Sequence, residues 1–138
     1  MIRSKPEEEV RQRLLSLMKD ELGFPAELIC VERSLSSLPH LAGQIVPDRR
    51  FDIICFKKHG EVILPLLIVE CKAVLLTKKA AMQVIGYNHF AKAPFIALAN
   101  QKSVYTGYKC KDSGYHFEEG LFSYERMGRF EETRDSRV

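Results

Sequence analysis

Three residues of this chain could carry out chemistry together: Asp52, Glu70 and Lys72. Glu70 and Lys72 end the apolar run 66–69, and Asp52 lies upstream in a second strand-like segment. Because alternate residues of a strand point to the same face, the Glu70 and Lys72 side chains project together, whereas Cys71 points the other way. Charged groups in an apolar strand are costly without partners, and two carboxylates offer the oxygen ligands that Mg²⁺ prefers. An acid on one strand and acid-x-lysine on the next is typical of metal-dependent phosphodiesterases.

The composition is that of one compact domain. The chain has 138 residues, of which 46% are apolar, so it can bury a core without disulfides. Its formal net charge is only +3, from 21 basic and 18 acidic residues, which does not by itself predict a nucleic-acid partner. The longest apolar stretch, 62–69, is too short to span a bilayer, and the first nine residues contain no apolar signal core. We therefore expect a cytoplasmic protein that does not enter membranes.

The four cysteines do not form a metal-binding pattern. They are widely separated, without a C-x-x-C pair, so a zinc site is not expected. Three of them lie in apolar, strand-like segments, where a free thiol behaves as a small buried hydrophobe. Cys71 is not expected to be a nucleophile, because it points away from Glu70 and Lys72.

The hydrophobic pattern predicts an α/β domain over residues 1–124. The expected elements are a helix at 6–22, a strand at 28–35, a loop at 36–49, strands at 50–56 and 62–73 joined by a turn at 57–60, a helix from a Thr77 cap to about Lys92, a buried strand at 94–99, and strands near 104–110 and 115–122. The segment 125–138 is charged with almost no apolar residues, so we expect a flexible tail or order that depends on a partner.

Five segments of the chain resemble, in order, the N-terminal nuclease domain of type I restriction enzyme R subunits. They are residues 6–12, 50–54, 65–73, 83–88 and 93–100, so the resemblance covers roughly residues 5–100. Gln83 and Tyr87 are four residues apart and share a helix face, as in the Q-x-x-x-Y branch of the PD-(D/E)XK superfamily. The resemblance implies a restriction-endonuclease-like core, with a central mixed β-sheet flanked by helices in the order α-β-β-β-α-β.

The resemblance also implies a role for each residue of the central motif. Asp52 and Glu70 would bind Mg²⁺, or Mn²⁺ as a substitute, and the backbone carbonyl of Cys71 would add a third oxygen. Lys72 would orient or deprotonate the attacking water and stabilise charge on the scissile phosphate. The physical chemistry agrees, because a divalent ion polarises a phosphoryl oxygen and lowers the pKa of its bound water.

Three further residues are implied by the resemblance, and each has a simpler explanation. Glu8 would face the metal, directly or through water, but acidic residues in a first helical turn also complement the helix dipole. Gln83 and Tyr87 would position the water, the lysine or the DNA backbone, although both could be polar groups on the surface of an amphipathic helix. We favour the functional interpretation of Gln83 and Tyr87, whereas the metal role of Glu8 rests mainly on the resemblance.

Two points about the first acidic residue stay open at this stage. Asp48 follows a proline and competes with Asp52, which we prefer because it lies in a strand rather than a loop. A tight turn between the two central strands would set Asp52 opposite Leu67, whereas a longer connection would set it opposite Glu70. The connection 57–64 is longer than the usual turn of the family, which favours the pairing with Glu70.

The expected function is hydrolysis of phosphodiester bonds in DNA by a metal-activated water, that is, a Mg²⁺-dependent endonuclease. The alternative is a catalytically weak or inactive module that binds nucleic acid or protein. RNA and branched DNA stay open as substrates, and a homodimer as an assembly state. The chain has no Gly-x-x-x-x-Gly-Lys-Ser/Thr loop, so a DNA motor or a specificity subunit would be a separate partner. Four basic residues could hold phosphates or simply be solvated: Arg49, Arg50, Lys78 and Lys79.

Overall fold

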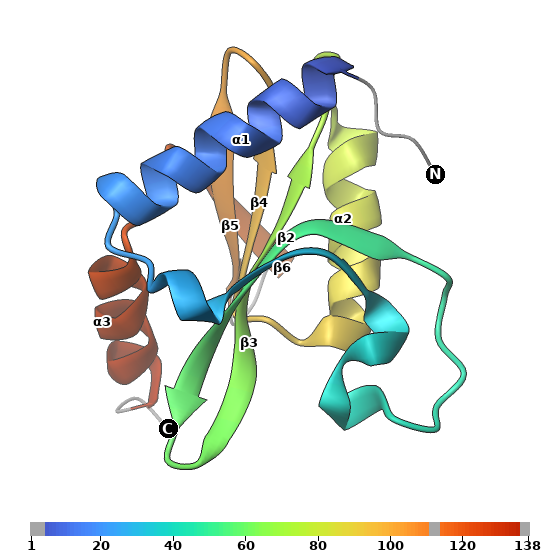
Figure 1. Cartoon of the computed structure of the whole chain (residues 1–138), viewed down its shortest axis with the longest axis vertical. Helices are drawn as coiled ribbons and strands as arrows, with labels where there is room; N and C mark the ends of the chain where they lie inside the picture. Colours follow the sequence, from blue (N-terminus) through green and yellow to red (C-terminus); the bar gives the residue numbers. More distant parts are fainter. Residues whose placement is uncertain (1–4, 111–113, 136–138) are drawn as a thin grey trace.

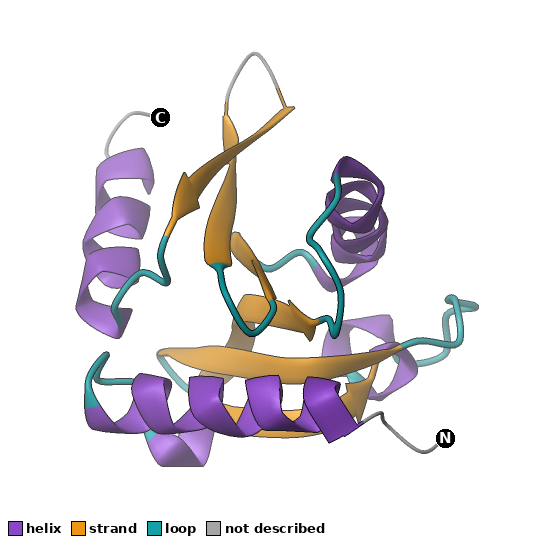
Figure 2. Cartoon of the chain, turned by 90° about the horizontal axis from the view of Figure 1, so that it is seen from above, coloured by secondary structure: helices purple, strands orange, loops and turns teal. Residues whose placement is uncertain are grey.

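The computed structural model describes residues 5–110 and 114–135, which form one mixed β-sheet with helices on both faces (Figures 1 and 2). The strands are β1 (Ile29–Ser34), β2 (Arg50–His59), β3 (Val62–Cys71), β4 (Phe95–Ala99), β5 (Val104–Cys110) and β6 (Gly114–Glu119); the α-helices are α1 (Lys5–Asp20), α2 (Lys78–Ala91) and α3 (Tyr124–Asp135). The strands lie side by side in chain order, and only β3 and β4 are parallel. The predicted α/β class and order of elements are therefore confirmed.

The helices divide between the two faces of the sheet. Helix α1 packs beside the paired residues Ala99 and Val104, and Phe130 of α3 contacts the rings of Phe95 and Tyr108 on the same face. Helix α2 lies on the other face, as Figure 2 shows. Among the described residues, no helix combines the length and the apolar character that a membrane crossing requires.

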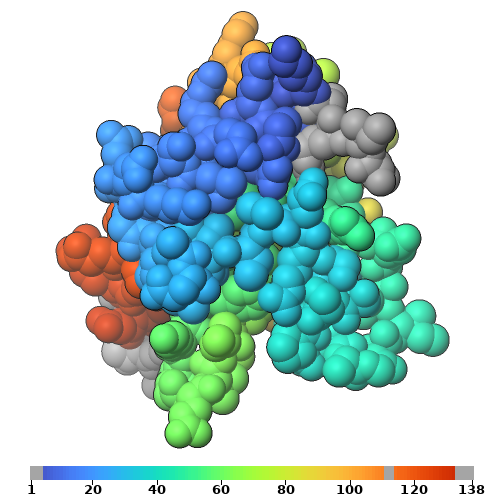
Figure 3. All heavy atoms as spheres, in the orientation of Figure 1, coloured from blue at the N-terminus to red at the C-terminus, as the bar shows by residue number. Residues whose placement is uncertain are grey.

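The β2–β3 hairpin is longer than predicted. Its strands stay paired out to His59 and Val62 and turn at Gly60, which has a φ of +64° that favours glycine. The predicted turn at 57–60 and the longer connection to residue 64 are thus wrong, because three more residue pairs extend the ladder. Figure 3 shows the hairpin tip projecting from the molecule, below the face covered by α1 and the segment that follows it.

A β-bulge sets the pairing in the inner half of this hairpin. Phe56 pairs with Pro65, but its neighbour Cys55 pairs with Leu67, so Leu66 is the extra residue. The shifted pairing continues to Ile53 and Val69, and one further step places Asp52 opposite Glu70. This is the pairing that we favoured from the sequence, although a bulge and not a long loop produces it.

Helix α2 begins and ends almost where the sequence indicates. The Thr77 side chain accepts a hydrogen bond from the Ala80 backbone N–H at 3.1 Å, which caps the helix. At the other end Lys92 adopts a left-handed conformation with φ of 58°. The Asn88 side chain bonds both the N–H and the carbonyl of Ala93, and so fixes the turn into β4.

The C-terminal segment, expected to be a flexible tail, instead forms helix α3. Two apolar residues one turn apart anchor it: Met127 is fully buried, and Phe130 lies 4.5 Å from Tyr108 between ring centroids. A Lys57–Glu131 ion pair adds a contact with β2. The prediction failed because two apolar residues at helical spacing suffice to hold a charged helix against the sheet. Residues 136–138 lie outside the described residues.

The role of α3 can be tested with two neighbouring substitutions. Met127→Ala removes a fully buried side chain and should lower the free energy of unfolding by about 2–5 kcal/mol. Gly128→Ala lies on the exposed side, where an added Cβ meets no atom within 4 Å, and should raise it by about 0.8 kcal/mol. Urea denaturation measures both. If both variants unfold like the wild type, α3 does not belong to the cooperative domain.

Candidate functional site

Asp52 and Glu70 form a buried pair of carboxylates on the neighbouring strands β2 and β3, near the end of β3. Only 3% of the Asp52 surface and 4% of the Glu70 surface are exposed. Asp52 Oδ2 accepts a hydrogen bond of 2.6 Å from the Cys71 backbone N–H, which ties it to the neighbouring strand. Because the N–H and C=O of a strand residue point to the same side, the Cys71 carbonyl is on the Asp52 side of β3. Asp48 is exposed in the loop before β2.

Arg49 supplies positive charge to this pair, and the sequence analysis did not assign it that role. Its Nη2 forms an ion pair with Glu70 Oε2, and its guanidinium carbon lies 4.9 Å from the centre of the Tyr87 ring. Its backbone carbonyl accepts from the Leu35 N–H at 2.7 Å, which fixes the start of β2. Arg49 therefore links one expected metal ligand, Glu70, to one residue of the Q-x-x-x-Y motif, Tyr87.

Lys72 lies directly after β3 and is half-buried. Its backbone N–H donates to the Ala99 carbonyl at 2.8 Å, so the strand geometry continues through this residue. Alternation then directs its side chain to the face that carries Glu70. The structure thus brings Asp52, Glu70 and Lys72 to one face of two neighbouring strands.

Glu8 and Gln83 are not drawn into this cluster. The Glu8 carboxylate accepts hydrogen bonds from Arg11 and from Gln12, at 2.5–3.0 Å and 2.9 Å, within α1. Gln83 is exposed on α2. Figure 1 shows the first turns of α1 and α2 at the same end of the sheet as the end of β3, on opposite faces. The expected roles of Glu8 and Gln83 stay predictions.

The thiols and the shifted titrating groups lie outside the cluster. Burial, and to a lesser degree Cys30, raises the pKa of Cys55 to about 12, so its thiol stays protonated. On the β5–β6 hairpin the Tyr108 hydroxyl donates to Glu118 at 2.9 Å, which lowers the pKa of Glu118. Burial, followed by that hydrogen bond, raises the pKa of Tyr108. These groups support the fold rather than the candidate site.

The oxygen chemistry of the site suits a small divalent cation. Two carboxylates with almost no exposed surface carry a charge that must be balanced, and hard oxygen donors match Mg²⁺. Arg49 now balances Glu70 and would share that carboxylate with a cation. Over residues 5–110 and 114–135 there is no group of three or more His, Cys, Asp or Glu side chains that could hold a metal ion. Further ligands would come from backbone, water or substrate, as is usual for Mg²⁺.

The fold and the site define an α/β domain with a restriction-endonuclease-like core and a buried acidic pair near the end of β3. Comparison with family models gives the family: residues 6–119 match the type I restriction enzyme R protein N terminus, and the chain belongs to this family. The match extends the resemblance of residues 5–100 through β6 and relates the chain to restriction-modification nucleases. No curated protein and no solved structure gives a significant match.

The Arg49–Glu70 ion pair can be tested by unfolding. Arg49→Ala should lower the free energy of unfolding by about 2 kcal/mol, because it leaves a buried carboxylate without its guanidinium. Combining it with Glu70→Gln should cost less than the sum of the single changes. Arg50→Ala, an exposed neighbour, serves as the control and should stay within about 0.5 kcal/mol of wild type. Additive effects of Arg49 and Glu70 would contradict the pairing.

Proposed function

We propose that this chain is a Mg²⁺-dependent nuclease domain of the PD-(D/E)XK type that hydrolyses phosphodiester bonds in DNA. The observation that carries the proposal is the buried Asp52–Glu70 pair with Lys72 on the same face. Membership in a restriction enzyme family supports it independently. Burying two adjacent acids is costly even with the Arg49 ion pair to Glu70, so a functional reason for them is favoured over a structural one.

Each residue of the cluster would have a definite task. Asp52, Glu70 and the Cys71 carbonyl would hold the cation, which when bound polarises the phosphoryl oxygen and lowers the pKa of its water. The Lys72 ammonium would orient the attacking water and stabilise negative charge that develops on the phosphate. Glu8 would act on the metal through water.

Arg49 and Tyr87 would control the orientation of Glu70. The guanidinium lies against the Tyr87 ring, and this contact limits its rotation while it holds the carboxylate. When the carboxylate turns to a cation, the guanidinium becomes available for a phosphate oxygen nearby. Gln83, on the same helix face as Tyr87, would contact the DNA backbone or the water.

A second candidate function is a nucleic-acid-binding or protein-interaction module of the same fold with little catalysis. The specific observation in its favour is the Arg49–Glu70 ion pair, which already neutralises one of the two acids. In either case the natural context would include DNA, with RNA or branched DNA as further substrates, and a motor or specificity subunit or a second copy as partner.

Cleavage of plasmid and single-stranded DNA with Mg²⁺ or Mn²⁺ tests the catalytic proposal directly. Wild type should cut, and Lys72→Ala should be slower by about 100-fold or more, because it removes the group that assists the water and the phosphate. Lys58→Ala is the matched control, since this lysine is exposed at the far end of β2. Folded wild-type protein that never cuts would favour the second candidate.

Metal binding separates the two candidates without a cleavage assay. Asp52→Asn keeps an oxygen that can accept the Cys71 N–H but removes the charge, so Mn²⁺ affinity measured by calorimetry should fall about ten-fold or more. Glu8→Gln should have a smaller effect, because its expected contact is through water. Equal affinity of wild type and Asp52→Asn would show that the acidic pair is not the metal site.

A further inference from the structure

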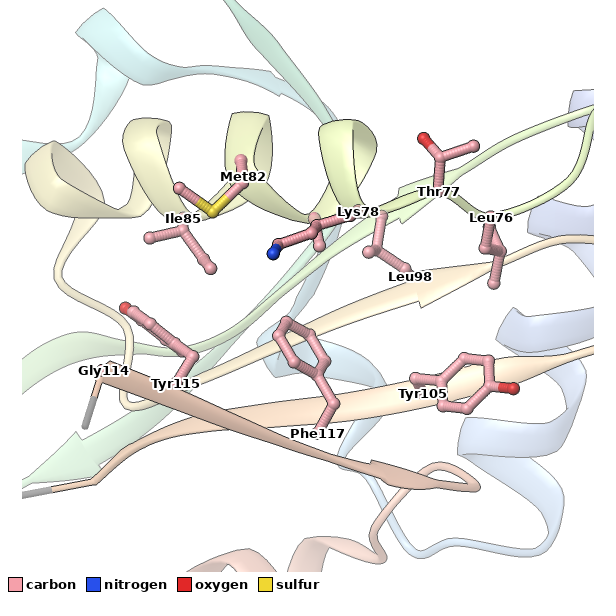
Figure 4. A pocket seen from close by; sticks show the side chains of 11 residues that line it. Leu76, Thr77, Lys78, Met82, Ile85, Leu98, Tyr105, Gly114, Tyr115 and Phe117 are labelled. Atoms are coloured by element: carbon pink, nitrogen blue, oxygen red, sulfur yellow. The ribbon is translucent and has the colours of Figure 1, made fainter.

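A cavity of about 600 Å³ lies between α2 and the β5–β6 hairpin (Figure 4). Its walls include Lys78 of α2, Leu98 of β4 and the rings of Tyr105, Tyr115 and Phe117 on the hairpin. Its volume is within the range of small-molecule sites, and its lining is largely apolar and aromatic, as such sites are. None of the catalytic roles discussed above uses these residues.

The cavity and the acidic pair lie on the same face of the sheet. Glu70 pairs with Leu98 across β3 and β4, and Leu98 pairs with Tyr105 across β4 and β5. Asp52, Glu70, Leu98 and Tyr105 therefore form one row, and the first two belong to the acidic pair while the last two line the cavity. Two strand spacings separate Glu70 from Tyr105, or about 10 Å. Leu98 is buried beneath α2, so a polymer with a phosphate at the acidic pair would reach the cavity by passing around the first turn of α2.

Two aromatic rings of the cavity, those of Phe117 and Tyr115, are positioned by contacts with the rest of the protein. The Phe117 ring lies over Gly107 on the neighbouring strand, where a Cβ would come within 2.5 Å of it, so the glycine makes room for the ring. The Tyr115 hydroxyl is hydrogen-bonded by the Asn88 side chain at 2.9 Å. Rigid aromatic walls reduce the loss of side-chain entropy on binding, and nucleobases stack on such rings.

One cation accompanies the aromatic walls. Figure 4 shows the Lys78 side chain extending from α2 over the cavity toward Phe117. An ammonium beside an apolar, aromatic cavity fits a ligand with a flat apolar part and a negative charge. A nucleotide has both, in its base and its phosphate.

We propose that this cavity binds an unpaired nucleobase of the strand whose backbone lies at Asp52 and Glu70, with Lys78 on an adjacent phosphate. The proposal deepens the proposed function, since it names single-stranded or locally opened nucleic acid as the preferred ligand. Tyr105 and Phe117 are the stacking residues.

The test uses a single-stranded oligodeoxynucleotide that carries 2-aminopurine, with EDTA present so that no metal-dependent cleavage occurs. Wild type should bind it and change the 2-aminopurine fluorescence on stacking. Phe117→Leu and Tyr105→Leu keep apolar bulk but remove a ring, so each should weaken binding about five-fold or more and abolish the fluorescence change. Their binding should keep the wild-type dependence on salt, because no phosphate contact is lost.

Two further variants separate stacking from charge and from folding. Lys78→Gln should reduce the slope of log affinity against log salt concentration by about one, while keeping the fluorescence change. Tyr108→Leu is the matched control, because Tyr108 lies on the same strand but packs against Phe130 on the opposite face. It should bind like wild type. Thermal unfolding verifies that all variants are folded, and Lys78→Gln keeps the test decisive if a ring variant unfolds.

The outcomes distinguish this inference from the proposed function. If folded ring variants bind and stack like wild type, or if wild type does not bind the oligonucleotide, the inference is overturned. Loss of stacking supports it even when no cleavage is seen with Mg²⁺, a result that would contradict the nuclease alone. If wild type cleaves DNA but Phe117→Leu binds the oligonucleotide as wild type does, the nuclease proposal is supported and the inference is overturned. A change in self-association in Phe117→Leu, without any effect on the oligonucleotide, would assign the cavity to a protein contact and overturn the inference.

Discussion

The bulge in the β2–β3 hairpin is the constraint on which the candidate site depends. In the outer part of the hairpin the pairing would set Asp52 opposite Val69, and Glu70 would then lie opposite Phe51. The two acids would project from opposite faces, because a shift of one residue turns every side chain over. The extra residue Leu66 corrects this by one position and brings both carboxylates to the α2 face. A small irregularity far from the acids thus determines whether they meet.

The burial of the two acids then requires a cation, and the structure provides Arg49. A buried carboxylate without compensation is costly, and the pairing of Arg49 with Glu70 reduces that cost while leaving the arginine 29% exposed. A cation that is only partly enclosed can move aside for a divalent ion. The Arg49 side chain therefore compensates the buried carboxylate of Glu70 and would leave it available to the cation of the proposed function.

How much of this follows from the sequence depends on how local each interaction is. Strand alternation placed Glu70 and Lys72 on one face, and the Thr77 cap located α2, because both depend on neighbouring residues. The role of Arg49 could not be predicted, because its contact with Glu70 depends on the course of the segment between β1 and β2. In the structure this segment turns twice in short 3₁₀ helices and buries Leu35, Leu38 and Leu41. Helix α3 was missed because its packing rests on two residues within a charged stretch. The bulge could not be predicted from the alternation of side chains along the strand alone.

The two faces of the sheet serve different purposes. Helices α1 and α3 together cover one face with buried apolar residues such as Met18 and Met127. On the other face lies α2, whose buried side chains Val84, Asn88 and Ala91 form one line along the helix. The segment between β1 and β2 contacts the end of this helix, where His40 hydrogen-bonds the Phe90 carbonyl at 3.0 Å. Helix α2 thus separates two groups of side chains on this face. The acidic pair with Arg49 and Tyr87 lies on one flank, and the aromatic cavity lies on the other. The acids and the cavity lie on the same side of the sheet because Asp52, Glu70, Leu98 and Tyr105 occupy one row of paired positions.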